Sequence, residues 1–466
     1  MLIKDFDTIA AIATPVGIGG IAVIRVSGTD AETVASRIVF TKNKKPVSSL
    51  ESHKLTLSEV RRISDGTVLD EVLISVMRVP NSYTGETVVE INCHGGFLSA
   101  QLILEELFNL GVRQAEAGEF TRRAFVNGKC DLAHAEAVID VIHANSELGQ
   151  SNAAKALSGK LSEKVNSIRD KAVSLAANLS AVADFPDEID DLPHEDMLYQ
   201  IDDILKSIDE MLGGFKKGKI LRDGISTVIA GRPNVGKSSL LNALSRTDRA
   251  IVTDIPGTTR DVIEEYVNIG GVALRLIDTA GIRNSDNSVE KIGIEKAKET
   301  IEASDLCLFV LDSSEDVSTD DIEIYSYLKN KNSIAILNKS DKNAFGDIDY
   351  YSEKLCIPKT DFVCTSTLNP ENSSGITELE EKIVERFLAG GISKDDVFIS
   401  NDRQHSSLIK ARKAAENMKN SFLSQMPSDL LYVDLEEVIS ALGEITGLTV
   451  QDEIIEEVFE RFCVGK

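Results

Sequence analysis

Strand-like and helix-like patterns of hydrophobic and polar residues alternate in the first part of the chain. The stretches GGIAVIRVSG and TVVEINCHGG are rich in β-branched residues, which is typical of strands. The stretch FLSAQLILEELFNLG has apolar residues at helical spacing and a glycine after its last turn, which predicts an amphipathic helix. We therefore expect an α+β or α/β domain over residues 1–122.

The pattern becomes helical from residue 123. Apolar residues recur there at spacings of three or four, which places them on one face of a long helix. These residues are Leu157, Leu161, Val165, Ile168, Ala172, Leu175, Leu179 and Val182. The segment DFPDEIDDLPHED then interrupts the helix. Its carboxylates lack the spacing of a known cation-binding loop, so a solvated loop is the favoured interpretation.

Residues 220–388 alternate short apolar strands with helical stretches, which is typical of a parallel α/β sheet. The strand candidates are STVIAG, ALRLIDTAG, LCLFVLD, SIAILNKSD and FVCTST. Residues 389–466 are helical again. We therefore expect a multidomain fold in which a helical domain, formed by residues 123–219 and 389–466, carries an inserted α/β domain.

Composition agrees with several globular domains. The chain has 466 residues, 42% of them hydrophobic and 27% charged, and it contains no continuous apolar run of transmembrane length. Its N-terminal stretch resembles neither a signal nor a transit peptide. The six cysteines form no CxxC pair, so we predict no zinc or redox motif and a reducing, cytoplasmic location.

The formal net charge of −25 limits the possible partners. Binding of nucleic acid through counterion release needs clustered lysine and arginine. If RNA is a substrate, this chain alone should hold it weakly, and a partner must supply the positive surface. The alternative is that the acidity only keeps the protein in solution.

A phosphate-binding loop is the clearest chemical motif. The sequence GRPNVGKS follows a strand candidate and opens a helix, which is the context that a GxxxxGKS loop requires. Gly231 and Gly236 allow backbone N–H groups to turn toward phosphates. Lys237 is expected to reach the β- and γ-phosphates, and Ser238 to bind Mg²⁺.

Two further motifs complete a phosphate and magnesium site. DTAG ends the next long strand, so Asp278 can hold Mg²⁺ through water and the Gly281 N–H can sense the γ-phosphate. GTTRD precedes it and offers Thr259 as a second hydroxyl ligand. These motifs together predict a nucleotide-hydrolysing domain.

A fourth motif, NKSD, predicts which base is bound. Asp341 can accept hydrogen bonds from guanine N1–H and the 2-amino group, whereas adenine would leave this carboxylate unpaired. Asn338 can brace the phosphate loop, and Lys339 can lie over the base. STL at residues 366–368 falls where a base-contacting loop is expected. The order of the four motifs indicates a GTPase.

The hydrolytic machinery departs from a common pattern. Many GTPases place a water-orienting glutamine after the DxxG glycine, but this chain has Ile282 there. Glu290 is a candidate replacement, and the alternative is that it is one of several solvated acids. Arg260 and Arg283 lie nearby in sequence, but neither is an evident arginine finger.

Several stretches of the sequence, taken together, resemble one known family. ATPVGIGGIAVIRVSG, NSYTGE, HGG, AGEFTRRAFVNGKCDLAHAEAV, the phosphate loop and the final CVGK resemble the MnmE (TrmE) family of tRNA modification GTPases. The likeness spans the whole chain. Many GTPases share the phosphate loop, whereas the N-terminal stretches and the C-x-G-K tail are specific to this family.

The resemblance implies three parts: an N-terminal folate-binding domain that forms a homodimer, a helical domain, and an inserted Ras-like GTPase domain. It implies a partnership with the FAD-dependent protein MnmG. The pair would add an aminomethyl or carboxymethylaminomethyl group to C5 of the wobble uridine of tRNA. The one-carbon unit would come from a tetrahydrofolate (the 5,10-methylene or 5-formyl form), and glycine or ammonium would supply the amine.

The resemblance also implies site residues. The catalytic residues would be Glu290, Lys237 and Cys463, and the folate contacts would be Arg25, Glu90, Lys129 and Lys466. Magnesium would be bound by Ser238 and Thr259, and K⁺, in place of an arginine finger, by Asn234, Thr253, Ile255 and Thr258. GTP contacts would be Asn234, Val235, Gly236, Lys237, Ser238, Ser239, Thr253, Thr258, Thr259, Asp278, Thr279, Ala280, Gly281, Asn338, Lys339, Asp341 and Ser366.

Two alternatives stay open. The residues alone favour a frayed tail with a stray thiol, whereas the resemblance brings Lys466 near a folate and Cys463 near the one-carbon unit, with Gly465 supplying the bend. For function, the rival is a switch GTPase of ribosome assembly or signalling that transforms no RNA base. Such a protein usually has a basic RNA-binding domain, and the sequence contains none.

Overall fold

The structure, a computed structural model, is described over residues 7–15, 17–185, 187–188, 192–247, 265–277, 300–367, 374–393 and 395–466. The chain forms two compact units. The first comprises Met1–Ile139, Ala156–Leu205 and Lys410–Lys466, and the second comprises Asp140–Lys155 and Lys206–Ile409. The two stretches of the second unit therefore lie between stretches of the first in the sequence. The domain bounds predicted from the hydrophobic pattern stay a prediction.

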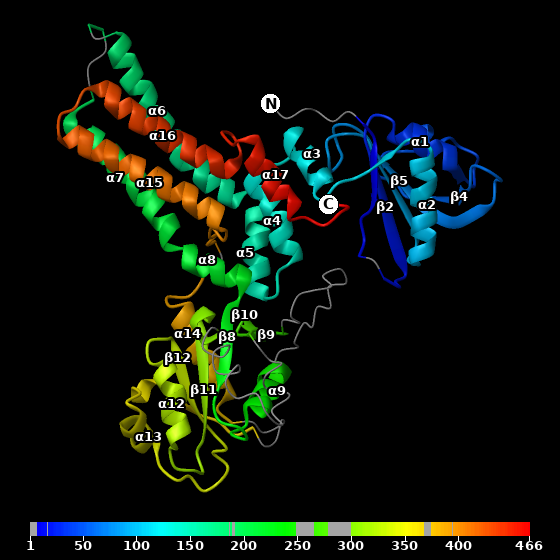
Figure 1. Cartoon of the computed structure of the whole chain (residues 1–466). Helices are drawn as coiled ribbons and strands as arrows, with labels where there is room; N and C mark the ends of the chain where they lie inside the picture. Colours follow the sequence, from blue (N-terminus) through cyan, green and yellow to red (C-terminus); the bar gives the residue numbers. More distant parts are fainter. Residues whose placement is uncertain are drawn as a thin grey trace. The chain divides into compact units, whose positions relative to one another are not determined.

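A seven-stranded sheet is the scaffold at the N-terminal end of the first unit (Figure 1). Its strands are β1 (Ile9–Ile12), β2 (Ile21–Ser27), β3 (Val39–Thr41), β4 (Thr56–Arg61), β5 (Val68–Met77), β6 (Val88–His94) and β7 (Arg113–Gln114). Their order is β3-β4-β5-β6-β2-β1-β7, antiparallel except where β7 pairs with β1. Side chains alternate between the two faces of the sheet. Ile24, Ile74 and Ile91 are fully buried in one core with residues of α1 (Ala31–Ile38) and α2 (Phe97–Asn109).

Helices make up the rest of the first unit. They include α3 (Glu119–Val126), α6 (Lys160–Asp184), α16 (Ser428–Thr446) and α17 (Asp452–Glu460). Four more, α4 (Leu132–Ile142), α5 (Glu147–Leu157), α7 (His194–Gly213) and α15 (Asp402–Leu423), have residues in both units. The predicted apolar face of α6 packs against α16, and both helices bury leucines along it.

One residue of the predicted long helix lies elsewhere. Leu157 ends α5, and α6 begins only at Lys160. Between the two helices Gly159 has a φ of 90°, a left-handed conformation that glycine adopts without strain and that ends a right-handed helix. The prediction that Leu157 shares one helix with Leu161 is therefore wrong, because hydrophobic spacing is blind to such a break.

A six-stranded sheet is the centre of the second unit, in the order β13-β12-β11-β8-β10-β9. Only β9 is antiparallel to its neighbour. The strands of the six-stranded sheet are β8 (Ile225–Ala230), β9 (Glu265–Ile269), β10 (Val272–Leu276), β11 (Leu306–Asp312), β12 (Ser333–Asn338) and β13 (Phe362–Cys364). The accompanying helices are α8 (Phe215–Asp223), α9 (Lys237–Thr247), α12 (Thr319–Leu328), α13 (Ile348–Leu355) and α14 (Ile376–Phe387).

Both faces of this sheet are covered, as parallel sheets require. Along β11, Leu308 and Val310 belong to one core, whereas Phe309 and Leu311 belong to the other. Cys307 is fully buried on β11, the strand predicted from LCLFVLD. The polar residues that follow β8, β11 and β12 come together at the carboxyl edge of the sheet, where open α/β sheets bind ligands.

Candidate functional sites

The loop of residues 231–236 joins β8 to α9 at this carboxyl edge. Gly231 and Gly236 have φ values of 148° and 103°. A Cβ at Gly231 would lie 2.3 Å from the Val310 oxygen, and one at Gly236 would lie 2.1 Å from Asn338 Nδ2. Both positions therefore exclude larger residues, and the loop leads directly into the N-terminus of α9, whose free N–H groups favour an anion.

Lys237, Ser238 and Ser239 begin α9. The Lys237 amine folds back over the loop and donates to the carbonyl oxygens of Gly231 and Arg232, at 2.7 and 2.6 Å. Burial lowers the pKa of this amine. A lysine amine at this place in a phosphate loop is the group that pairs with nucleotide phosphates in such loops.

Asn338 ties the NKSD motif to the phosphate loop. Its side chain is fully buried, and Nδ2 donates to the Val235 oxygen at 2.9 Å. Its Oδ1 accepts from the Thr365 hydroxyl at 3.1 Å. Lys339 donates to the Asn234 oxygen at 2.7 Å. The structure thus brings two motifs that lie about a hundred residues apart into direct contact.

Asp341 and Ser366 lie together on the next two loops. The Ser366 hydroxyl donates to Asp341 Oδ1 at 2.6 Å, and the Ser340 N–H donates to the Thr365 oxygen at 3.1 Å. The carboxylate of NKSD and the start of STL therefore form one polar group, in the relation that the motif order predicts.

Sequence reasoning missed two acids at this edge. Asp312, the last residue of β11, forms an ion pair with Lys339 at 2.5 Å. Burial raises the pKa of Asp312, but hydrogen bonds from Lys339 and Ser314 outweigh burial, so the net pKa is lowered. Asp321, in the first turn of α12, accepts from Arg232 Nε at 2.9 Å. A carboxylate that ends the apolar strand LCLFVLD was the available signal for Asp312.

Nine predicted nucleotide, metal or catalytic residues lie outside the described residues. They are Thr253, Ile255, Thr258, Thr259, Asp278, Thr279, Ala280, Gly281 and Glu290. The same is true of Arg260, Ile282 and Arg283.

A second candidate site lies in the first unit, where the segment Cys463–Lys466 docks onto the start of α3. The N–H of Gly118 donates to the Cys463 oxygen at 3.4 Å, and the N–H of Phe120 donates to the Lys466 oxygen at 3.1 Å. Ala117 and Val464 form an antiparallel bridge. We refer to residues 463–466 as the tail segment.

Gly465 is the bend of the tail segment. Its φ is 100°, and a Cβ there would lie 2.4 Å from the Ile12 oxygen. Only glycine fits both the conformation and the close approach to β1. The Lys466 amine beyond it is half-buried, and burial, followed by the neighbouring Arg25 guanidinium, lowers its pKa.

Arg25 lies at the centre of this second site. Its guanidinium pairs with Glu90 at 2.9 Å and donates to the Gly465 oxygen at 3.4 Å. The same group lies over the rings of Tyr83 and Phe120, 5.1 and 5.5 Å from their centroids, which is cation–π geometry. Sequence reasoning missed both aromatic residues, although each lies in a motif that carries the family resemblance, NSYTGE or AGEFTRRAF.

The other predicted residues of this site have simpler surroundings. Lys129 donates to the Pro80 oxygen at 3.0 Å, and its side chain passes Gly85. The Cys463 side chain is exposed. The structure therefore brings Arg25, Glu90 and the tail segment together, with Lys129 on the loop after α3.

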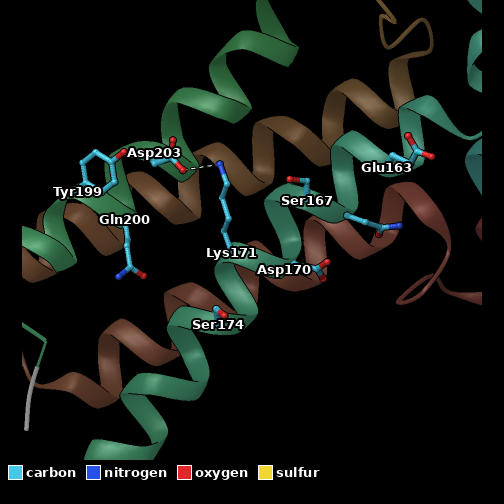
Figure 2. Close-up of a pocket in the computed structure, with 9 residues that line it drawn as sticks. Glu163, Ser167, Asp170, Lys171, Ser174, Tyr199, Gln200 and Asp203 are labelled. Atoms are coloured by element: carbon cyan, nitrogen blue, oxygen red, sulfur yellow. Dashed lines mark ion pairs between the residues drawn. The ribbon is translucent and has the colours of Figure 1, made fainter.

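A groove of about 670 Å³ on α6 and α7 has different chemistry (Figure 2). Its polar lining includes Asp170, Tyr199 and an ion pair between Lys171 and Asp203 at 2.6 Å. The groove contains no cysteine or histidine. Within the described ranges, no cluster of three or more histidine, cysteine or acidic side chains is arranged to hold a metal ion. The groove therefore offers no evident catalytic centre.

Over the same described part of the chain, none of the helices combines the length and the apolar character needed to cross a membrane.

Comparison with known proteins covers nearly the whole chain. The family model for the N-terminus of the GTP-binding protein TrmE matches residues 8–129, and the MnmE helical-domain model matches residues 132–463. The solved G domain of the T. maritima FeoB iron transporter shares 29% identity over 34% of this chain and 97% of that chain. Its TM-score of 0.26 is too low to support a structural conclusion.

Curated relatives match from end to end. The tRNA modification GTPases MnmE of Carboxydothermus hydrogenoformans and Clostridioides difficile are each 44% identical to this chain, over 99% of it and 99% of their own length. The protein of the same name from Bacillus velezensis is 42% identical over 99% of this chain and 100% of its own. Both family models and these full-length relatives agree that the chain belongs to the MnmE family of tRNA modification GTPases.

Proposed function

We propose that this chain hydrolyses GTP and, with the FAD-dependent partner MnmG, adds an aminomethyl or carboxymethylaminomethyl group to C5 of the wobble uridine of tRNA. The observation that carries the proposal is the position of the tail segment. Its Gly465 oxygen accepts a hydrogen bond from Arg25, which is paired with Glu90. A switch GTPase that transforms no RNA base has no evident use for this arrangement. The chain thus combines a nucleotide site with a separate polar site.

The nucleotide site has the parts that GTP binding needs. Lys237 can exchange its two backbone acceptors for phosphate oxygens, and Ser238 can bind Mg²⁺ in the first turn of α9. Asp341, which already accepts a hydrogen bond from the Ser366 hydroxyl, is exposed and can accept from guanine. Bound Mg²⁺ supplies charge neutralisation for phosphoryl transfer.

The remaining nucleotide residues are assigned from the family. Glu290 would orient the attacking water, and Asp278 and Thr259 would complete the Mg²⁺ and phosphate contacts. Asn234 would bind K⁺ with Thr253, Ile255 and Thr258. Asn234 is exposed in the phosphate loop with a φ of 65°, a conformation that asparagine tolerates better than most residues.

The second site has a donor set that fits a tetrahydrofolate. Glu90 can accept hydrogen bonds from amino and ring N–H groups, as a pterin presents, while it remains paired with Arg25. Lys129 and Lys466 supply amines that can pair with carboxylates. A bound folate supplies the one-carbon unit. The exposed Cys463 thiol belongs to the same segment as Lys466 and is proposed to act next to that unit.

The open face of the seven-stranded sheet supports a homodimer. Leu57 on β4 is the register partner of Leu73 on β5, and these side chains are 42% and 39% exposed. Phe40 on β3 and Ile21 on β2 of the same sheet are also exposed, at 45% and 65%. Apolar groups gathered on one side of a sheet favour burial against a second copy.

The net charge of −25 supports a division of labour in which MnmG supplies most of the tRNA-binding surface. A cytoplasmic location agrees with a tRNA substrate and with cysteines that are free in the structure.

Nucleoside mass spectrometry tests the proposed function. Deletion of the gene should remove the modified wobble uridine from tRNA, and the full-length chain should restore it. A chain with Cys463→Ser should not restore it, although it still hydrolyses GTP. Unchanged wobble uridine in the deletion strain, together with a defect in ribosome assembly, would favour the switch GTPase instead.

A further inference from the structure

The first turn of α3 is the point where the parts of the second site meet. Its backbone N–H groups at Gly118 and Phe120 hold the Cys463 and Lys466 oxygens. The Phe120 ring lies under the Arg25 guanidinium. The next residue, Thr121, shares a hydrogen bond of 2.8 Å with the hydroxyl of Tyr83, the other ring beneath Arg25. The tail segment and the two rings beneath Arg25 are therefore all in contact with this turn.

A buried carboxylate, that of Glu119, stabilises the first turn of α3 through several hydrogen bonds. Glu119 is fully buried at the start of α3. It accepts from both Arg113 terminal nitrogens, at 2.5 and 3.0 Å, and from Arg123 Nη2 at 2.8 Å. It also accepts from the backbone N–H of Glu116 at 2.8 Å. One carboxylate thus joins two arginines and the backbone that precedes the helix.

The network continues away from the tail segment. Asp7 accepts from Arg113 Nε at 2.6 Å and from Arg123 Nη2 at 2.7 Å. Arg123, 5% exposed, also pairs with Glu86 at 3.2 Å. Charged side chains therefore join the start of α3 to the segment before β1 and to the loop before β6. Tyr83 lies on that same loop.

Stability alone does not account for two buried charges, Glu119 and Arg123, in this network. Desolvation offsets much of the attraction within a buried ion pair, and apolar replacements often stabilise a protein equally well. Hydrogen-bonded charges do impose one geometry, because each carboxylate oxygen and each guanidinium nitrogen has fixed directions. The geometry imposed here is that of the turn that receives the tail segment.

We propose that Glu119, through Arg113 and Arg123, is a positioning residue that holds the first turn of α3 so that it docks the tail segment and supports Arg25. The role of this geometry in folate binding rests on the proposed function, whereas the docking itself does not. Glu119 acts on the tail segment indirectly: its carboxylate holds the N–H of Glu116, and the nearby N–H groups of Gly118 and Phe120 donate to the tail segment.

The test uses the full-length chain with Glu119→Gln, which keeps the shape of the side chain and removes its charge. The first measurement is the rate at which carboxypeptidase B releases Lys466. The second is the affinity for 5-formyltetrahydrofolate. The control is Ile103→Ala, which removes a fully buried side chain of α2 in the core of the same unit. Both variants are measured at the same number of degrees below their own melting temperatures, so that differences in stability do not decide the result.

We expect Glu119→Gln to release Lys466 at least tenfold faster than the wild type and to bind the folate at least tenfold more weakly, with GTP hydrolysis unchanged. Ile103→Ala should match the wild type in both measurements. The proposal is overturned if Glu119→Gln releases Lys466 at the same rate as the wild type or as the control.

If Glu119→Gln does not fold, Arg113→Lys tests the proposal instead. The Arg113 side chain is 39% exposed, and lysine keeps its positive charge, so this variant should fold. A folded Arg113→Lys chain should release Lys466 faster than the control, and a wild-type rate overturns the proposal. If the wild type binds no folate, the proposed function fails, while the release of Lys466 still tests the positioning role.

Discussion

The backbone N–H of Phe120 donates a hydrogen bond of 3.1 Å to the backbone oxygen of Lys466. This contact joins the start of α3 to the last residue of the chain, and it lies within reach of the Arg25 guanidinium, which covers the Phe120 ring. A segment that local sequence describes as a frayed end is thereby held in place on the N-terminal sheet.

Cys463→Ser should abolish tRNA modification and leave GTP hydrolysis unchanged. The Cys463 side chain is exposed, so its replacement should change the free energy of unfolding by less than about 0.5 kcal/mol. A serine hydroxyl keeps the shape but loses most of the nucleophilicity of a thiol. Modification is measured with MnmG, folate and tRNA supplied. Cys356→Ser, another exposed cysteine, is the matched control; a wild-type rate in Cys463→Ser would contradict the assignment.

Gly465→Ala should undock the tail segment. An alanine at a φ of 100° is strained by about 1–2 kcal/mol, and its Cβ would also meet the Ile12 oxygen at 2.4 Å. Because 1.4 kcal/mol corresponds to a factor of ten, folate affinity should fall about tenfold or more, as measured by calorimetry.

Gly66→Ala is the control for that experiment. Gly66 has a φ of 72°, so the strain of an alanine is similar, but a Cβ there meets nothing within 4 Å. If both variants bind folate with wild-type affinity, the bend at Gly465 is not needed for the site.

Asp341→Asn should change the choice of nucleotide. The carboxylate would accept from two N–H groups of guanine, whereas an amide presents a donor that suits the 2-oxo group of xanthine. GTP affinity should fall at least tenfold, and xanthosine triphosphate should become the better substrate. Ser366→Ala, which removes the hydroxyl that donates to Asp341, serves as a control with a smaller effect on both nucleotides. A variant that still prefers GTP would show that Asp341 does not contact the base edge.

GTP hydrolysis should depend on K⁺. The sequence has no evident arginine finger, and a K⁺ ion near Asn234 would neutralise charge that develops between the β- and γ-phosphates. Turnover should fall at least tenfold when Na⁺ replaces K⁺ at constant ionic strength, while GTP affinity stays nearly the same. Asn234→Ala should lose most of the K⁺ stimulation. Equal turnover in both salts would rule out the K⁺ site.

The sequence by itself determined the local elements and the order of the nucleotide motifs. β-branched stretches and short apolar runs predict β2, β6 and the parallel strands, and apolar residues at helical spacing predict α2. The motif GRPNVGKS predicts its own loop, since glycines at two positions and a lysine at the helix start form the site over only eight residues.

Only the tertiary structure decided which distant residues meet. The Arg25 guanidinium contacts the Gly465 oxygen across a sequence separation of 440 residues. No spacing rule predicts such a contact, because it depends on how Phe459 of α17 and Phe462, which follows this helix, pack against Leu132 and Phe125. Similarly, no local pattern predicts that Glu119 is enclosed with two arginines, Arg113 and Arg123. Local patterns follow from neighbours in the chain, whereas the second site follows from the packing of α3, α17 and the N-terminal sheet.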